Sequence, residues 1–173
     1  NQERLVSVFI KLENLINEFA AVEQVTSNIA LNNTKICRID DVIDEALDIA
    51  MVDPGQVTIS KLEDVSLNAD FKLLAIAAKN MIDNALKYSP NKHVNITITR
   101  ESIKFINEGE RLSKELRHYV EPFTKGESAQ KSFGLGLYIV ENIIKAHKLT
   151  LSGTRGKFKL KFKTSHICLN FKI

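Results

Sequence analysis

The sequence predicts an α+β fold: a two-layer sandwich with one mixed, mostly antiparallel sheet and helices on one face, preceded by a long N-terminal helix. Segments with helical spacing and segments with strand alternation are both present, and they do not follow one another as strict βαβ units. With 173 residues, 44% of them apolar, the chain is large enough to bury the core of one domain.

Residues 2–31 carry an apolar stripe at helical spacing, which predicts a helix of about seven turns. The stripe consists of Leu5, Val8, Phe9, Leu12, Leu15, Ile16, Phe19 and Val22. We expect it to pack against another helix, within a hairpin or across a dimer; folding back on its own domain is the alternative. Because the sequence begins with asparagine and shows no secretory signal, we expect a piece of a longer protein.

The following segments are expected to alternate between strand and helix. Residues 35–39 are predicted to form a strand, and Asp40 or Asp41 is expected to cap the helix that runs to residue 50. The Asp-Pro-Gly sequence at 53–55 is typical of a turn. Short strands are expected after it, at 56–60 and 65–67.

The second half begins with a helix expected over residues 70–88, which must end before Pro90. Alternation predicts two strands joined by a tight turn at Arg100 and Glu101. The remaining expected elements are these strands at 94–99 and 102–107, helices near 113–121 and 134–147, and β-prone stretches at 149–152, 157–163 and 166–173.

Composition excludes several classes of partner. The formal net charge is only +3, and the cationic residues are spread from Lys11 to Lys172, which favours an anionic small ligand over nucleic acid. No apolar run approaches the roughly 20 residues that cross a bilayer, so we expect no membrane contact by this part of the protein. Cys37 and Cys168 lie in β-rich stretches far apart, which predicts neither a disulfide framework nor a zinc site.

The stretch NMIDNALKYSP, residues 80–90, places polar side chains on one helical face: Asn80, Asn84, Lys87 and Tyr88. Such a stripe is either a solvated face or a ligand site. Amide oxygens suit Mg²⁺, lysine can meet phosphate as a point charge, and tyrosine can stack on a base.

Two glycine-containing segments are weaker candidates. Gly109, after a predicted strand, allows either a simple turn or a close approach to a ligand. Gly134 and Gly136 lie where a loop enters a helix, and the free N–H groups of that junction either bind an anion or only begin a closely packed helix. The polar loop 121–132, with Lys125 and Lys131, is either a lid over phosphates or an ordinary connection.

The order of these motifs resembles the ATP-binding domain of sensor histidine kinases, the Bergerat ATP-binding fold shared with type II topoisomerase, chaperone and mismatch-repair ATPases. NMIDNALKYSP is similar to the N box of this family and FINEG (105–109) to its first glycine box. YVEPFTKG (119–126) resembles the F box, and SFGLGLYIVENIIKAH (132–147) the second glycine box. The resemblance divides the chain into the second helix of a dimerisation hairpin, residues 1–33, and a catalytic ATP-binding domain, residues 36–173.

The resemblance implies a role for each matching residue. It implies that Asn84 holds Mg²⁺ with help from Asn80, that Lys87 lies near the phosphates, and that Tyr88 lies against adenine. Gly109 would line the base pocket. The remaining implied roles are lid ordering by Phe123 and Lys125, phosphate binding through the backbone at Gly134 and Gly136, and packing by Leu135 between those glycines.

The match departs from the family pattern at three positions. Asn107 and Arg111 stand where the first glycine box has aspartate and glycine, and Ser132 replaces the first glycine of the second box. The aspartate accepts a hydrogen bond from the adenine amino group. A neutral hydrogen bond contributes about 0.5–1.5 kcal/mol and a charged one about 1.5–3, so we expect weaker nucleotide binding, with a fixed neighbour or water preventing Asn107 from flipping. Arg111 either crowds the pocket or reaches a phosphate.

No HExxT-like acceptor motif occurs among the four histidines, His93, His118, His147 and His166. We interpret His118, near the F box, as a candidate phosphate contact. His147 is expected at a helix C-terminus, where a positive charge suits the dipole.

The leading interpretation is the catalytic part of a sensor histidine kinase that binds ATP with Mg²⁺ and phosphorylates a histidine outside this chain. Its expected partners are a second copy, through the helical hairpin, and a response regulator. We expect it on the cytoplasmic side, in a protein anchored in the inner membrane by segments outside this sequence. The alternatives are a degenerate nucleotide-binding regulator, motivated by Asn107 and Arg111, and an ATPase of the same fold that clamps by dimerising.

Overall fold

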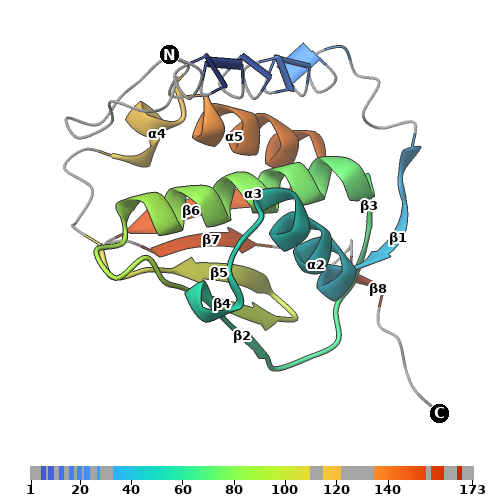
Figure 1. Cartoon of the computed structure of the whole chain (residues 1–173). Coiled ribbons are helices and arrows are strands. Elements are labelled where there is room, and N and C mark those ends of the chain that lie inside the picture. Colours follow the sequence, from blue (N-terminus) through green and yellow to red (C-terminus); the bar gives the residue numbers. More distant parts are fainter. Residues whose placement is uncertain are drawn as a thin grey trace.

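The computed structural model describes the chain from residue 33 to 109 without a break and, elsewhere, residues 5–6, 8–9, 12–13, 16–17, 19–20, 22–23, 27, 115–121, 135–154, 157–161 and 167–168. The described residues between 5 and 23 are helical, as predicted (Figure 1). Most of their large apolar side chains are exposed, whereas Val22 is half-buried and packs against the core. Within the described parts of the chain, no helix is both long and apolar enough to cross a membrane.

Five strands form the main sheet in the order β2 (Val57–Lys61), β4 (Val94–Thr99), β5 (Ser102–Ile106), β7 (Lys157–Lys161) and β6 (Thr150–Thr154). Only the β2–β4 pair of this sheet is parallel. A second, antiparallel sheet contains β1 (Lys35–Arg38), β3 (Ser66–Ala69) and β8 (Ile167–Cys168). The predicted fold class is confirmed, although the strands divide between two sheets instead of joining in one.

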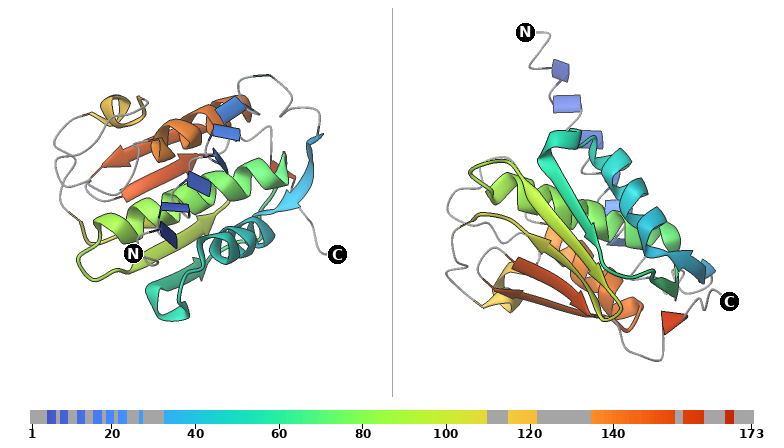
Figure 2. Two further views of the ribbon diagram at one scale, coloured as in Figure 1. Left: turned by 45° about the horizontal axis from the view of Figure 1, so that its top comes forward. Right: turned by 90° about the horizontal axis from the view of Figure 1, so that it is seen from below.

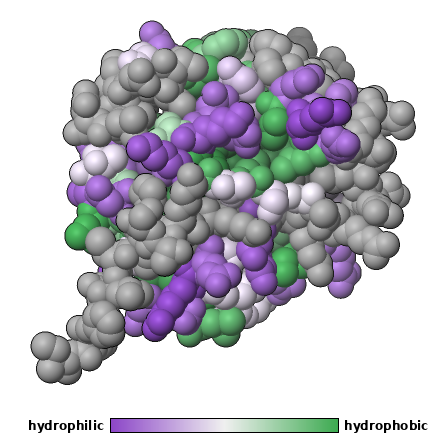
Figure 3. Space-filling view, turned by 180° about the vertical axis from the view of Figure 1, so that it is seen from behind, coloured by the Kyte–Doolittle hydropathy of each residue, from purple (hydrophilic) through white to green (hydrophobic). Residues whose placement is uncertain are grey.

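Three helices cover one face of the five-stranded sheet: α2 (Ile39–Ala50), α3 (Phe71–Tyr88) and α5 (Gly136–Ala146) (Figures 1 and 2). Helix α3 packs against both α2 and α5 and is therefore the central element of the helical layer. Two short helices complete the described elements, the 3₁₀ turn Pro54–Gln56 and α4 (Leu116–Tyr119). Seen from behind, described hydrophilic residues are interspersed with apolar ones, in keeping with the spread of charge along the chain (Figure 3).

The core lies between the helices and the five-stranded sheet. Strand β4 alternates as a half-buried strand should, with Val94, Ile96 and Ile98 inward. Phe105 of β5 and Met81 of α3 are fully buried with them. Because each such side chain stabilises the fold by about 1.5–3 kcal/mol on burial, the position of α3 over the sheet is strongly determined.

The start of α3 is fixed as the sequence predicts. Asp70 is the N-cap, and its Oδ1 accepts a hydrogen bond from the backbone N–H of Leu73 at 3.0 Å. The start of α2 differs from the prediction, because Ile39 is already helical and the N-cap is Arg38, without a side-chain bond. Asp40 and Asp41 therefore lie in the first turn, where carboxylates suit the helix dipole.

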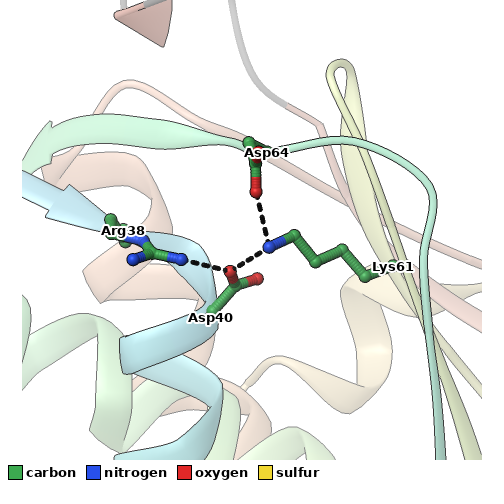
Figure 4. A network of polar contacts seen from close by, with 4 residues as sticks. All are labelled: Arg38, Asp40, Lys61 and Asp64. Atoms are coloured by element: carbon green, nitrogen blue, oxygen red, sulfur yellow. Dashed lines mark hydrogen bonds and ion pairs between the residues drawn. The ribbon is translucent and has the colours of Figure 1, made fainter. Parts of the chain in front are cut away.

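The side chain of Asp40 does not cap the helix but joins a network of ion pairs with Arg38, Lys61 and Asp64 (Figure 4). Its Oδ2 lies 3.1 Å from Arg38 Nη2 and 2.5 Å from Lys61 Nζ, and Lys61 also reaches Asp64 at 2.5 Å. The pairs link α2 to the end of β2 and the loop before β3. Because these groups are partly exposed to solvent, each pair contributes only about 0–1 kcal/mol.

His147 lies at the C-terminal end of α5, as predicted, but its ring is held by hydrogen bonds instead of serving the helix dipole as an exposed charge. The side chain is buried, its Nε2 accepts a hydrogen bond from the backbone N–H of Asp70 at 3.0 Å, and its Nδ1 lies 2.7 Å from the carbonyl oxygen of Ile143. A ring that accepts at Nε2 and donates at Nδ1 is neutral. His147 therefore joins the end of α5 to the start of α3 by hydrogen bonding.

Candidate functional site

The polar face of α3 is not a freely solvated stripe. Asn80 is only 6% exposed, Asn84 and Lys87 are half-buried, and Tyr88, at the last turn, is 43% exposed. Burying an amide is costly unless its groups are bonded, so the partners of Asn80 are informative.

The first group of polar residues lies where α3 meets the start of α5. Asn80 Nδ2 donates to the carbonyl oxygen of Ile76 at 2.9 Å, which fixes the orientation of the amide. A Cβ atom at Gly136 would lie 3.2 Å from Asn80 Oδ1 and 3.5 Å from Asn84 Nδ2. Both amides thus face the first residue of α5, and glycine is the residue that lets the helix approach them this closely.

The second group lies at the other end of the same helix face. Gly109, just beyond β5, has the backbone oxygen of Tyr88 and the side chain of Asn107 as neighbours. A Cβ at position 109 would lie 2.7 Å from Asn107 Nδ2 and 3.0 Å from Tyr88 O, so any side chain would force one of them to move. Lys87 Nζ lies 5.0 Å from the centre of the Tyr88 ring, a cation–π arrangement.

Asn107 is the buried polar group of this second cluster. It is 8% exposed and follows the last residue of β5. No described residue makes a hydrogen bond with its side-chain amide. Leaving such a group without a bond costs about 1–3 kcal/mol, so a ligand that bonds the Asn107 amide would recover that free energy. The predicted fixed neighbour of Asn107 is not among the described residues.

Comparison with known proteins shows which family has this arrangement. The sequence profile of the histidine kinase-, DNA gyrase B-, and HSP90-like ATPases matches residues 69–165, more than half of the chain. The chain belongs to this ATPase family. The family predicted from the four motifs is thereby confirmed.

Two curated relatives of this ATPase chain are sensor proteins. The sensor histidine kinase ArsS of Helicobacter pylori is 31% identical over 172 residues, which are 96% of this chain and 40% of ArsS. The heme sensor protein HssS of Staphylococcus epidermidis is 35% identical over 96 residues, 53% of this chain and 21% of HssS. The chain therefore spans less than half the length of either relative.

A solved structure confirms the fold of the ATPase chain. The Acinetobacter baumannii histidine kinase AdeS has a TM-score of 0.70 and 20% sequence identity, with coverage of 95% of this chain and 84% of AdeS.

The residues singled out by the ATPase resemblance fall into described and undescribed sets. The structure brings Asn80 and Asn84 to Gly136, and Tyr88 and Asn107 to Gly109. Leu135 is buried in the core, and its role beside the nucleotide stays a prediction. Phe123, Lys125, Ser132, Gly134 and Arg111 lie outside the described residues, so their implied roles stay predictions.

Other contacts had no sequence signal. The Ile76 carbonyl that fixes Asn80 and the Tyr88 carbonyl beside Gly109 are backbone groups, which any residue type would supply.

The two side chains predicted to lie near phosphate contact aromatic rings. The ammonium of Lys87, expected near phosphate, lies over the Tyr88 ring. His118 stacks edge-on with Tyr119 at 5.6 Å, and its contact with phosphate stays a prediction.

Among the described residues, no three histidine, cysteine, aspartate or glutamate side chains gather so as to hold a metal ion. Among the described residues of the Gly136 cluster, the amide oxygens of Asn80 and Asn84 are the candidate ligands for a hard cation. Asn80 fits a hard cation because its nitrogen is already bonded to Ile76 and its Oδ1 is turned toward Gly136.

Proposed function

We propose that this chain is the catalytic part of a two-component sensor histidine kinase, which binds Mg²⁺-ATP and transfers the γ-phosphoryl group to a histidine outside this sequence. The observation that carries the proposal is the pair of clusters on one face of α3, around Gly136 and around Gly109. Eight residues separate Asn80 from Tyr88, which is about 12 Å along a helix. That span suits a nucleoside triphosphate lying along the face.

The Gly136 cluster is proposed to hold the phosphates. Asn84 with Asn80 would bind Mg²⁺, which supplies charge neutralisation for the transferred group. The first N–H groups of α5 lack helical acceptors and, with the backbone at Gly134, would donate to phosphate oxygens. Catalysis would rest on such positioning, since phosphoryl transfer asks for little covalent chemistry from the protein.

The Gly109 cluster is proposed to hold the base. Asn107 Oδ1 would accept a hydrogen bond from the 6-amino group of adenine, and Tyr88 would lie against the ring. Gly109 leaves room for both. Because the bond to Asn107 is neutral, we expect weaker binding than a carboxylate would give.

The N-terminal helix is proposed to be the second helix of a dimerisation hairpin, residues 1–33, ahead of a catalytic domain over 36–173. Supporting this, its described apolar side chains are largely exposed: Leu5, Val8, Phe9, Leu12, Ile16 and Phe19. Exposed apolar stripes of this kind mark association surfaces. The proposed partners are a second copy and a response regulator, and the proposed location is the cytoplasmic side of an inner membrane that other segments of the protein would span.

Labelled ATP tests the proposal. We expect the 173-residue chain to bind ATP in the presence of Mg²⁺ without labelling itself, and a longer form with the hairpin histidine to form an acid-labile phosphohistidine. Labelling of a histidine within the chain would contradict the assignment of the acceptor. Failure to bind ATP would contradict the proposal as a whole.

A second candidate, a regulatory module without phosphotransfer, is favoured by the neutral Asn107 at the base cluster. ATP binding by the longer form without any phosphohistidine would support that candidate. Steady ATP hydrolysis by the chain alone would instead indicate an ATPase that clamps by dimerising.

A further inference from the structure

Asn107 differs from the other buried amide of the site in how it is held. The amide of Asn80 donates to Ile76 O, whereas no described group bonds either amide atom of Asn107. Turning the Asn107 amide by 180° about its last torsion therefore breaks no hydrogen bond with a described residue. It exchanges nitrogen and oxygen, which are similar in size, in the space that Gly109 leaves open.

This freedom matters because the two amide atoms have opposite hydrogen-bonding roles. The nitrogen donates and the oxygen accepts, whereas a carboxylate at the same place only accepts. Adenine presents a donor, its 6-amino group, and guanine presents an acceptor, its 6-oxygen. A carboxylate facing position 6 selects the donor, and an amide that can turn selects neither.

We infer that the base pocket accepts 6-oxopurine as well as 6-aminopurine nucleotides, with Asn107 turning its amide to match the group at position 6. The inference rests on the proposed nucleotide binding and concerns its selectivity. With a 6-aminopurine, Asn107 Oδ1 accepts; with a 6-oxopurine, Nδ2 donates. In either arrangement the base bonds one polar group of an amide that is 8% exposed and that no described residue bonds.

Inosine triphosphate is the deciding probe, because it carries the 6-oxygen but lacks the 2-amino group of guanine, whose bulk would confuse the result. ATP and inosine triphosphate should displace a fluorescent ATP analogue, with Mg²⁺ present, at concentrations within about tenfold of each other. Asn107→Asp should tighten ATP and weaken inosine triphosphate, which widens the ratio about 10- to 100-fold.

Asn95→Asp is the matched control, because it makes the same chemical change at an exposed position of β4. It should leave the ratio unchanged. If circular dichroism shows that Asn107→Asp is not folded, Asn107→Ala replaces it, and this variant should weaken both nucleotides by the same factor.

Three results would overturn the inference. The first is wild-type protein that binds ATP at least about 100-fold more tightly than inosine triphosphate. The second is a ratio that Asn107→Asp leaves unchanged, or that Asn107→Ala changes, because position 6 would then be read elsewhere. The third is binding of neither nucleotide, and only this one also overturns the proposed function.

Discussion

The two ends of the polar face of α3 use the same side chain, asparagine, in different ways. At the Gly136 end, Asn80 is oriented by its bond to Ile76, so its oxygen faces one direction. At the Gly109 end, the described residues leave both atoms of the Asn107 amide unbonded. The difference teaches that an amide's selectivity depends on what holds it: the first offers a defined oxygen, and the second adapts to its ligand.

The largest effect on ATP binding is expected from a substitution that disrupts only the Gly136 cluster. Asn84→Ala removes the proposed Mg²⁺ ligand, and loss of a contact to a charged group should weaken ATP binding about 10- to 100-fold when Mg²⁺ is present. Without Mg²⁺, wild type and variant should bind alike. Titration of ATP with and without the metal measures both quantities.

Asn84→Asp is the control for that titration, because it keeps an oxygen ligand and should retain the dependence on Mg²⁺. Equal Mg²⁺-ATP binding by wild type and Asn84→Ala would remove Asn84 from the metal site.

The next largest effect on ATP binding is expected from a substitution that disrupts the Gly109 cluster. Gly109→Ala adds a methyl group 2.7 Å from Asn107 Nδ2 and 3.0 Å from Tyr88 O, so the amide must move away. Overpacking of this kind costs about 1–3 kcal/mol, and we expect ATP affinity to fall about tenfold or more. The Mg²⁺ dependence should persist, because the other end is untouched.

Gly55→Ala serves as the control for the glycine substitutions, because a Cβ at that position meets nothing within 4 Å. ATP affinity unchanged by Gly109→Ala, measured by the same titration, would show that the base does not lie beside Asn107.

A smaller effect on ATP binding is expected from a substitution of Gly136, the glycine of the Gly136 cluster. In Gly136→Ala the new methyl group lies 3.2 Å from Asn80 Oδ1, a contact that a shift of a few tenths of an ångström relieves. Alanine also favours a helix over glycine by up to about 1 kcal/mol. We therefore expect thermal stability close to that of wild type and a loss of ATP affinity of only a few fold.

If Gly136→Ala lowered ATP affinity more than Gly109→Ala does, the expected ranking of the two glycine substitutions would be wrong. Thermal denaturation followed by circular dichroism would separate a local effect from loss of the fold.

The smallest effect concerns Cys37, which lies in strand β1 of the three-stranded sheet. Burial raises the pKa of the Cys37 thiol, so less of it is thiolate at a given pH and alkylation should be slow at pH 8 compared with the denatured chain. A Cys168→Ser variant isolates the signal. Rapid alkylation of the folded protein, measured by mass spectrometry, would contradict the burial of Cys37.

Much of this site could be predicted from sequence because its spacing is helical. Positions 80, 84 and 88 must share a face of any helix over 70–88, and the glycines indicated where other segments approach. The cap of α2 could not be predicted in the same way, because Asp40 pairs with Lys61, which is 21 residues away in the sequence. His147 escaped for a similar reason, since its acceptor role depends on Asp70, 77 residues away.

The sequence could not show that Asn80 has a fixed orientation, or that no described residue bonds the amide of Asn107. The first depends on a backbone carbonyl and the second on the arrangement of side chains around position 107. Tertiary structure, not local pattern, decides which of two asparagines has a fixed orientation.

The hydrogen bond from Asp70 to His147 makes the far end of α5 a fixed pivot. Asp70 also caps α3, so the C-terminus of α5 and the N-terminus of α3 form one joint. Eleven residues separate His147 from Gly136, about 16 Å of helix acting as a lever arm. Any rigid tilt of α5 therefore produces its greatest displacement at Gly136, directly beside Asn80 and Asn84.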